Sequence, residues 1–172
     1  MARVRDIGID EVPEAVRPIY RRYAEEYGPF LNQVKVFAHR PPAVKHIMGL
    51  LLELADESLL PKRYLEIALV VVSKLNECRY CVAHHAPRLV DQGLPADTVA
   101  AILEPDCPGL DAVDRLRVHF SEAQIVELTL RTALCGFFNR FNDALQIGME
   151  DGVIADMLAH GGREADLPDA AE

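Results

Sequence analysis

The sequence lacks several features that define common classes of protein. Its longest apolar run, Ile67 to Val72, is far shorter than the ~20 residues that cross a bilayer, so we expect no membrane-spanning segment. Acidic residues outnumber basic ones 27 to 18, which argues against a broad nucleic-acid surface. The charged N-terminus, with Arg3, Arg5 and Asp6, contains no apolar stretch typical of a secretory signal. We therefore expect a cytoplasmic protein that binds neither membranes nor nucleic acids.

Signals for β-strands are also scarce. No segment alternates apolar and polar residues between tight-turn dipeptides, and Asp151-Gly152 lies near the C-terminal end. Half of the residues are apolar and 26% are charged, which is typical of a globular chain rather than a disordered one. With 172 residues, the chain fits a single all-α domain over residues 1–172.

The spacing of the apolar residues predicts helices almost throughout. The expected spans are 13–28, 30–39, 42 to beyond 54, 62–76, 78–93, 95–103, 111–120, 121–146 and 153–159. Ser121 with Gln124 forms a capping box at the start of the longest span. The Ile67 to Val72 run predicts that 62–76 is the most buried helix, and we expect a frayed tail beyond Gly161.

Two of the four cysteines, Cys78 and Cys81, form a Cys-x-x-Cys motif at the expected start of a helix. Residues three apart lie on one helix face, so the two sulfurs can approach bonding distance. The dipole at this helix end favours a thiolate, which is the nucleophilic form of cysteine. His85 lies one turn after Cys81 on the same face and can accept or return its proton. His84 points about 100° away and is the weaker candidate.

Glu66 is the acidic residue of the helix expected over 62–76. A buried carboxylate is costly unless it is paired. If the chain reverses near Asn76 and Glu77, the two flanking helices pack antiparallel, and Glu66 comes within a turn or two of the level of His85. That pairing would set the tautomer and the basicity of the imidazole. In the alternative, Glu66 reaches the surface or pairs with Arg63.

Other interpretations of these cysteines stay open. Cys78 and Cys81 could be small core hydrophobes. They could also bind zinc with His84 or His85, with Cys107 as a fourth ligand, although the usual second pair of ligands is missing. Cys107 and Cys135 are otherwise expected to be ordinary thiols.

Two segments of the chain match each other weakly. Setting Glu66 on Glu127 also sets Cys78 on Asn139 and Cys81 on Asn142, which suggests an internal helical repeat, with chance as the alternative. The two asparagines could hydrogen-bond across the fold, but exposure at the surface is the expected reading.

Glu66, Cys78, Tyr80, Cys81 and His85 together resemble a known signature. They are similar to the Glu…Cys-x-x-Cys-x-x-x-His pattern of the alkylhydroperoxidase D-like branch of the carboxymuconolactone decarboxylase superfamily. The segment Ser73-Lys74-Leu75-Asn76, just before Cys78, also fits the pattern of that branch. The resemblance implies an AhpD-like fold of orthogonal and antiparallel helices, with residues 42–150 as the core, 1–40 as a helical extension and 160–172 as a tail. It also implies a homo-oligomer, a trimer or a hexamer.

The same resemblance implies a thiol-dependent peroxidase, an oxidoreductase that acts on peroxide. Cys81 would be the peroxidatic thiol, and Cys78 would donate a proton and close a redox-active disulfide with Cys81. Glu66 and His85 would relay protons. The substrate would be a small hydroperoxide and the reductant a thiol protein or a small thiol, with no cofactor or metal.

Tyr80 and His84 are auxiliary candidates in this assignment. Tyr80 stands where the best-studied members of the family have a second histidine. Two alternatives remain: a lyase of the carboxymuconolactone decarboxylase type, and a non-catalytic helical assembly protein that holds structural zinc.

Overall fold

The computed structural model describes residues 2–28, 30–104 and 119–168, and these residues form helices and no strands. The predicted all-α class is therefore confirmed. The chain divides into two compact units, Met1–Ser58 with Ala144–Asp151, and Leu59–Asp143 with Gly152–Glu172. All the candidate site residues lie in the second unit.

The first unit consists of short helical segments joined end to end. They are η1 (Ile9–Glu11), η2 (Glu14–Val16), α1 (Arg17–Arg22), the π-helical η3 (Tyr23–Tyr27), α2 (Leu31–Phe37), α3 (Pro41–Ala43), the π-helical η4 (Val44–Met48) and α4 (Gly49–Asp56). Buried tyrosines tie them together, since the Tyr23 hydroxyl donates to Gln33 Oε1 over 2.8 Å. Asn32 also contacts residues 144–151 of the same unit, because its N–H donates to the Glu150 carboxylate.

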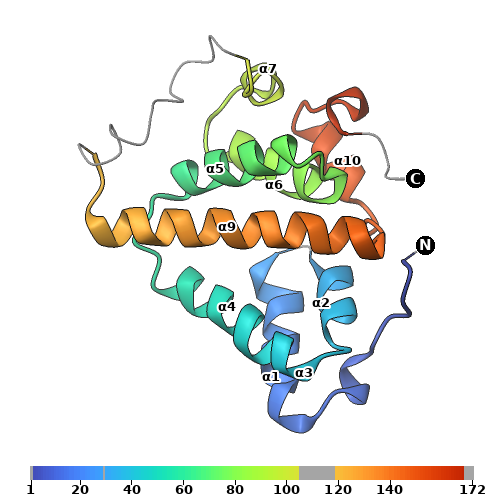
Figure 1. Cartoon of the computed structure of the whole chain (residues 1–172). Coiled ribbons are helices and arrows are strands. Elements are labelled where there is room, and N and C mark those ends of the chain that lie inside the picture. The colour runs from blue at the N-terminus through green and yellow to red at the C-terminus, as the bar shows by residue number, and fades with distance from the viewer. Residues whose placement is uncertain (1, 29, 105–118, 169–172) are drawn as a thin grey trace. The chain divides into compact units, whose positions relative to one another are not determined.

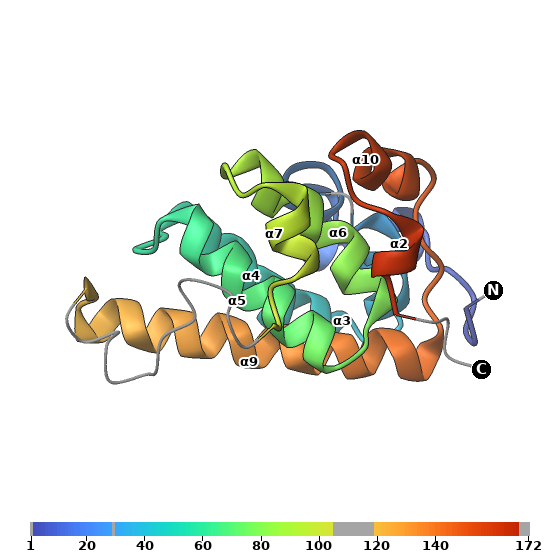
Figure 2. The same ribbon diagram turned by 90° about the horizontal axis from the view of Figure 1, so that it is seen from above.

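The second unit contains the longest helices. They are α5 (Lys62–Leu75), α6 (Arg79–Asp91), α7 (Ala96–Ala100), α9 (Glu122–Leu145), α10 (Val153–Ala159) and the short η5 (Glu164–Asp166). In both ribbon views α9 runs alongside α5, and α6 lies between α5 and α10 (Figures 1 and 2). Eight of the nine predicted helical spans thus have a counterpart. The remaining span, 111–120, lies outside the described residues except for its last two.

The chain reverses between α5 and α6, as the Glu66 argument required. Glu77 adopts a left-handed φ of 53°, and the Cys78 N–H donates to the Ser73 carbonyl over 3.0 Å. Cys78 is then the N-cap residue of α6. The turn therefore brings the first turn of α6 back beside the last turns of α5.

The start of α9 is fixed by hydrogen bonds. Ser121 and Gln124 form the predicted capping box, with the Ser121 N–H donating to Gln124 Oε1 over 2.9 Å and the Gln124 N–H donating to Ser121 Oγ over 3.3 Å. One turn later, the buried Glu127 accepts the Leu59 N–H over 2.9 Å and pairs with Arg131 at 3.3 Å. These contacts set the position of α9 along the start of α5.

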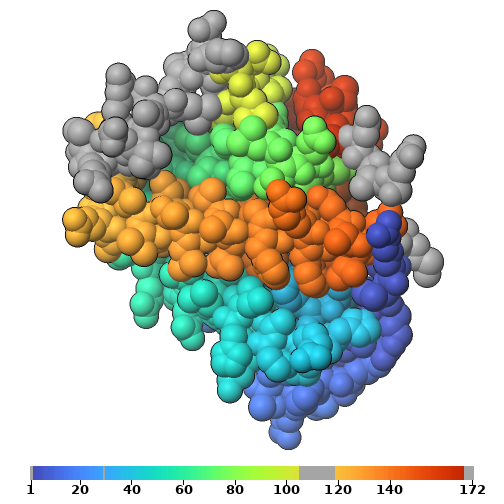
Figure 3. Space-filling model, viewed as in Figure 1, coloured from blue at the N-terminus to red at the C-terminus, as the bar shows by residue number. Residues whose placement is uncertain are grey.

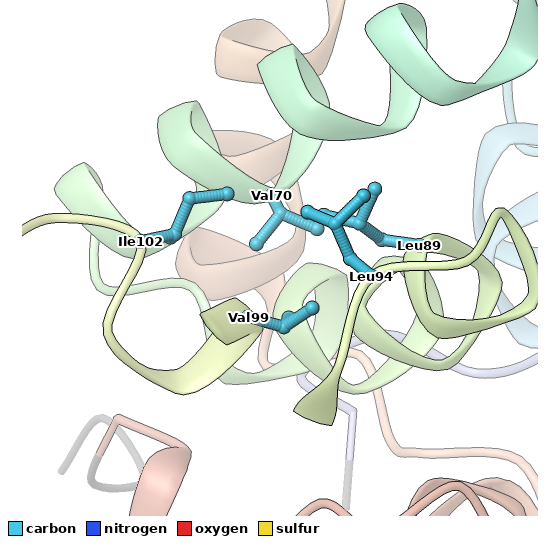
Figure 4. Packing of buried hydrophobic residues seen from close by; sticks show 5 residues of the cluster. All are labelled: Val70, Leu89, Leu94, Val99 and Ile102. Atoms are coloured by element: carbon cyan, nitrogen blue, oxygen red, sulfur yellow. The ribbon is translucent and has the colours of Figure 1, made fainter. Parts of the chain in front are cut away.

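A core of aliphatic side chains joins α5, α6 and α7. Val70, Leu89, Leu94, Val99 and Ile102 point toward one another in Figure 4, and all are buried. The expectation that α5 is the most buried helix is wrong. In α6 nearly the whole first three turns are buried, whereas Leu75 at the end of α5 is 67% exposed.

Two further expectations differ from the structure. The segment beyond Gly161 is not frayed over residues 163–168, because Arg163 pairs with Asp166 at 2.7 Å, Leu167 is buried and the Pro168 carbonyl accepts from Arg79. The two segments aligned as a repeat also fold differently, since the first turns at Asn76–Cys78 while the second lies within the continuous α9.

We expect the α5–α6–α7 core to dominate the stability of this unit. Leu89→Ala should lower the free energy of unfolding by about 2–5 kcal/mol, because it leaves a cavity at a fully buried position. Leu158→Ala, at a side chain that is 49% exposed, is the matched control and should change it by about 0.5 kcal/mol or less. Urea denaturation measures both, and equal effects of the two changes would contradict the assigned core.

Candidate functional site

Glu66 and His85 meet inside the second unit. His85 Nδ1 lies 2.9 Å from Glu66 Oε2, and both side chains are nearly inaccessible. Arg88 Nη1 lies 3.9 Å from the other carboxylate oxygen. The carboxylate thus faces inward to the imidazole, and the alternative of a surface position beside Arg63 does not hold. Because a carboxylate accepts, His85 Nδ1–H is the donor and Nε2 faces the rest of the site.

The pair holds its charges in the interior. Burial by itself lowers the pKa of His85, but the Glu66 carboxylate and a hydrogen bond to Cys135 outweigh it and raise the pKa to about 9. Burial likewise opposes ionisation of Glu66, yet His85, Arg88 and Arg131 together lower the pKa of its carboxyl. An imidazolium and a carboxylate therefore stand side by side at neutral pH.

Three free thiols lie next to this pair. Cys78 and Cys81 come from the start of α6, and Cys135 comes from the middle of α9. Cys81 hydrogen-bonds both other thiols, and Asn142 Nδ2 donates to its sulfur over 3.3 Å. Cys78 is fully buried and Cys81 is 2% exposed, so neither sulfur faces solvent.

Cys135, expected to be an ordinary thiol, belongs to this polar network. Its Sγ lies 3.4 Å from Ser73 Oγ and 3.7 Å from Asn139 Nδ2. The Cys81 hydrogen bond, with His85 and Ser73, outweighs burial and lowers the pKa of Cys135 to about 4. The hydrogen bonds to Cys135 and Cys78, together with burial, raise the pKa of Cys81 well above its usual value. Hydrogen bonds from His85 and Ser73 thus favour a thiolate at Cys135, while burial and the neighbouring thiols disfavour one at Cys81.

The two asparagines of α9 are buried, so the expectation that they lie at the surface is wrong. Asn139 Oδ1 accepts from Asn76 Nδ2 over 2.9 Å, and Asn142 donates to Cys81. A signal for this arrangement was present in the sequence. Glu127, Arg131, Cys135, Asn139 and Asn142 recur at spacings of three and four, which places a stripe of polar residues on one face of α9.

Tyr80 and His84 form a pair of their own on α6. Their rings lie 4.2 Å apart between centroids, and His84 Nδ1–H donates to the Tyr80 carbonyl over 2.6 Å. Both residues are buried. This contact orients the imidazole of His84 along its own helix, one residue away from the face that carries Cys81 and His85.

An open pocket lies along another face of α6. Its lining includes Val82, Ala86 and Val90 of α6, with Lys74 and Met157 from neighbouring segments. The cysteines are not part of that lining, so this pocket is not the entrance to the thiol cluster.

Within residues 2–28, 30–104 and 119–168, no three histidine, cysteine or acidic side chains are grouped so that they could hold a metal ion. Cys107, weighed above as a fourth zinc ligand, lies outside these residues. The helices of this part of the chain are all too short or too polar to span a membrane.

Residues 41–112 match the carboxymuconolactone decarboxylase family. An uncharacterised peroxidase-related protein from Ralstonia eutropha JMP134, an alkylhydroperoxidase AhpD core, has a TM-score of 0.67 and 21% identity, over 89% of this chain and 94% of that one. No curated protein matches the chain.

The debrominase Bmp8 has a similar structure. Its apo form gives a TM-score of 0.69 with 19% identity, over 90% of this chain and 96% of that one. A cysteine-to-alanine variant of Bmp8 in complex with 2,3,4-tribromopyrrole gives 0.66 with 20% identity, over 91% and 96%.

The fold is therefore that of the AhpD-like all-α proteins, as the resemblance implied. Residues 41–112 are also similar in sequence to the carboxymuconolactone decarboxylase family.

The Glu66–His85 pair makes a testable prediction about pH. The His85 ring should titrate near pH 9 in NMR, and Glu66→Gln should lower that midpoint because the carboxylate no longer stabilises the imidazolium. A raised folded-state pKa stabilises the fold below the unfolded value of about 6.5, and this contribution is lost as the pH rises through about 9. A wild-type midpoint near 6.5 would contradict the pairing.

Proposed function

We propose that the protein is a thiol-dependent oxidoreductase that reduces small hydroperoxides with the dithiol Cys78–Cys81. The observation that carries the proposal is the contact of the thiol cluster with an imidazolium that is itself held by a carboxylate. A thiolate nucleophile and a nearby acid are what cleavage of an O–O bond requires.

In this cycle the Cys81 thiol loses its proton as it attacks the terminal oxygen of the hydroperoxide. An S–O bond forms and the O–O bond breaks, so that Cys81 becomes a sulfenic acid and the other oxygen leaves as an alkoxide. The His85 imidazolium protonates the alkoxide to an alcohol, and the proton that Cys81 loses restores the imidazolium, while Glu66 keeps the ring oriented. Cys78 then attacks the sulfenic sulfur, which releases water and leaves the Cys78–Cys81 disulfide.

Burial requires a movement before substrate enters. Cys78 and Cys81 lie at the N-terminal end of α6, directly after the strained turn at Glu77. We propose that local opening of this turn exposes the sulfurs to peroxide and later to the reductant, a thiol protein or a small thiol. The cycle needs thiols that are kept reduced, so we propose the cytoplasm as its compartment.

Peroxide oxidation of the thiols is the direct test. Reduced protein mixed with hydrogen peroxide or an organic hydroperoxide should lose two thiols per chain and reduce one equivalent of peroxide. Cys81→Ser should abolish turnover, and Glu66→Gln should slow it by about 10-fold to 100-fold, because the proton donor is no longer held in place. Stopped-flow measurement of peroxide with titration of free thiols reports both.

A suitable control is Cys107→Ser, which should keep full activity. If no thiols were lost, or if Cys81→Ser turned over normally, the proposal would be refuted. A Cys78→Ser, Cys81→Ser double variant that decarboxylates a lactone acid would instead favour a lyase.

Reductive debromination is a second candidate reaction. The structural likeness to Bmp8, including its complex with 2,3,4-tribromopyrrole, favours testing it. A dithiol supplies two electrons when it closes a disulfide, which is also what replacement of a carbon–bromine bond by a carbon–hydrogen bond consumes. Bromide release from a brominated pyrrole by the reduced protein, with no reaction of peroxide, would assign this chemistry instead.

We also propose that the protein forms a homo-oligomer, a trimer or a hexamer. Val126, Leu130 and Phe137 lie on one side of α9 and are 65%, 37% and 43% exposed. In the space-filling view α9 forms an uninterrupted stripe across the face shown (Figure 3). Leu75, at the end of α5, is exposed as well. A row of exposed apolar side chains on one helix is typical of a surface that a partner covers.

Sedimentation equilibrium tests this assembly. The wild-type protein should sediment as a trimer or hexamer at micromolar concentration, and Phe137→Asp should shift it toward the monomer because a charge is buried at the interface. Leu158→Asp, at an exposed leucine on α10, is the control and should not change the mass. A wild-type monomer would contradict the proposal.

A further inference from the structure

A third cysteine belongs to the thiol cluster but has no part in the cycle above. Cys135 hydrogen-bonds Cys81, and it also hydrogen-bonds the His85 ring. Ser73 Oγ lies 3.4 Å and Asn139 Nδ2 lies 3.7 Å from its sulfur. A hydroxyl, an amide and an imidazolium are all donors, so these neighbours stabilise a thiolate at this position. Its lowered pKa agrees with that geometry.

Cys78 has the opposite surroundings. It is fully buried, and its side chain hydrogen-bonds the carboxyl group of Asp143. A carboxylate can only accept, so this neighbour offers Cys78 none of the donors that surround Cys135. The thiolate is the form that attacks an oxidised sulfur. The surroundings of Cys135 therefore suit the first attacking group, and those of Cys78 suit a thiol that reacts in a later step.

We propose that Cys135 is a third redox thiol of this site, which closes a disulfide with Cys81 once Cys81 has been oxidised. The inference rests on the proposed function only for the peroxide that oxidises Cys81. The Cys135 thiolate attacks the sulfur of the Cys81 sulfenic acid, an S–S bond forms and the S–O bond breaks. The hydroxide that leaves takes the proton of the His85 imidazolium and becomes water.

The oxidation then moves on to the Cys-x-x-Cys motif. Cys78 attacks Cys81 and displaces Cys135 as a thiolate, while the proton of Cys78 returns to His85. The products are the Cys78–Cys81 disulfide and the starting Cys135 thiolate beside an imidazolium. Cys81 contacts both other sulfurs, which is the arrangement that such an exchange needs.

The test uses Cys78→Ser in a chain that also carries Cys107→Ser, so that Cys81 and Cys135 are the remaining thiols. Diamide, which oxidises neighbouring thiols without peroxide, should remove both thiols and give a peptide in which Cys81 is linked to Cys135. The matched control adds Cys135→Ser, which preserves the hydrogen-bonding group and should leave no linked peptide. If Cys81 and Cys135 stay unlinked in the first variant, the inference is overturned.

Hydrogen peroxide separates this inference from the proposed function. With the same Cys78→Ser chain, the linked peptide should form and dimedone should trap little sulfenic acid. Stable, dimedone-trapped sulfenic acid at Cys81 without a link would overturn the role of Cys135 and leave the peroxidase proposal standing. A link with diamide but no reaction with peroxide would support Cys135 and refute the peroxidase.

A second variant covers the case in which Cys78→Ser does not fold. The chain with Cys107→Ser alone is treated briefly with less than one equivalent of diamide, alkylated and digested. Peptides linked through Cys81–Cys135 should appear beside those linked through Cys78–Cys81. Finding the second pair alone would overturn the inference.

Discussion

The buried contact between Glu66 and His85 is the constraint on which the rest of the site depends. A carboxylate in the interior is tolerated only with a partner, and here the partner comes from the next helix along the chain. Holding the ring by Nδ1 leaves Nε2 facing the sulfurs and keeps it protonated. The imidazolium in turn stabilises a thiolate at the buried Cys135.

Side chains from three helices form this cluster. α5 contributes the carboxylate and Ser73, α6 contributes two sulfurs and the imidazole, and α9 contributes a third sulfur with two amides. The polar groups satisfy one another, since none of the buried side-chain nitrogen or oxygen atoms of the described residues lacks a hydrogen-bond partner. The site is therefore a connected polar network within an apolar surrounding, and its members hold one another in place.

The fold and part of the site could be predicted from the sequence. Prolines and the Ser121–Gln124 capping box marked the helix ends, and the contact of Glu66 with His85 followed from the cost of an unpaired carboxylate. Cys135 could not be found in this way, because its importance depends on how α9 lies against α5 and α6. No spacing along the chain reports such a long-range approach, although the sequence does show the polar stripe on α9.

The long helix α9 has a consequence for how the sequence can vary. Near one end of α9, Glu127 accepts a hydrogen bond from the Leu59 N–H, and Cys135 lies about two turns later in the same helix. Each residue of an α-helix turns the chain by about 100°. A single inserted or deleted residue between Glu127 and Cys135 would therefore swing the sulfur and both amides away together, whereas three or four residues would restore most of their direction but shift them along the axis. Length changes of one residue in related chains should thus be excluded from this stretch.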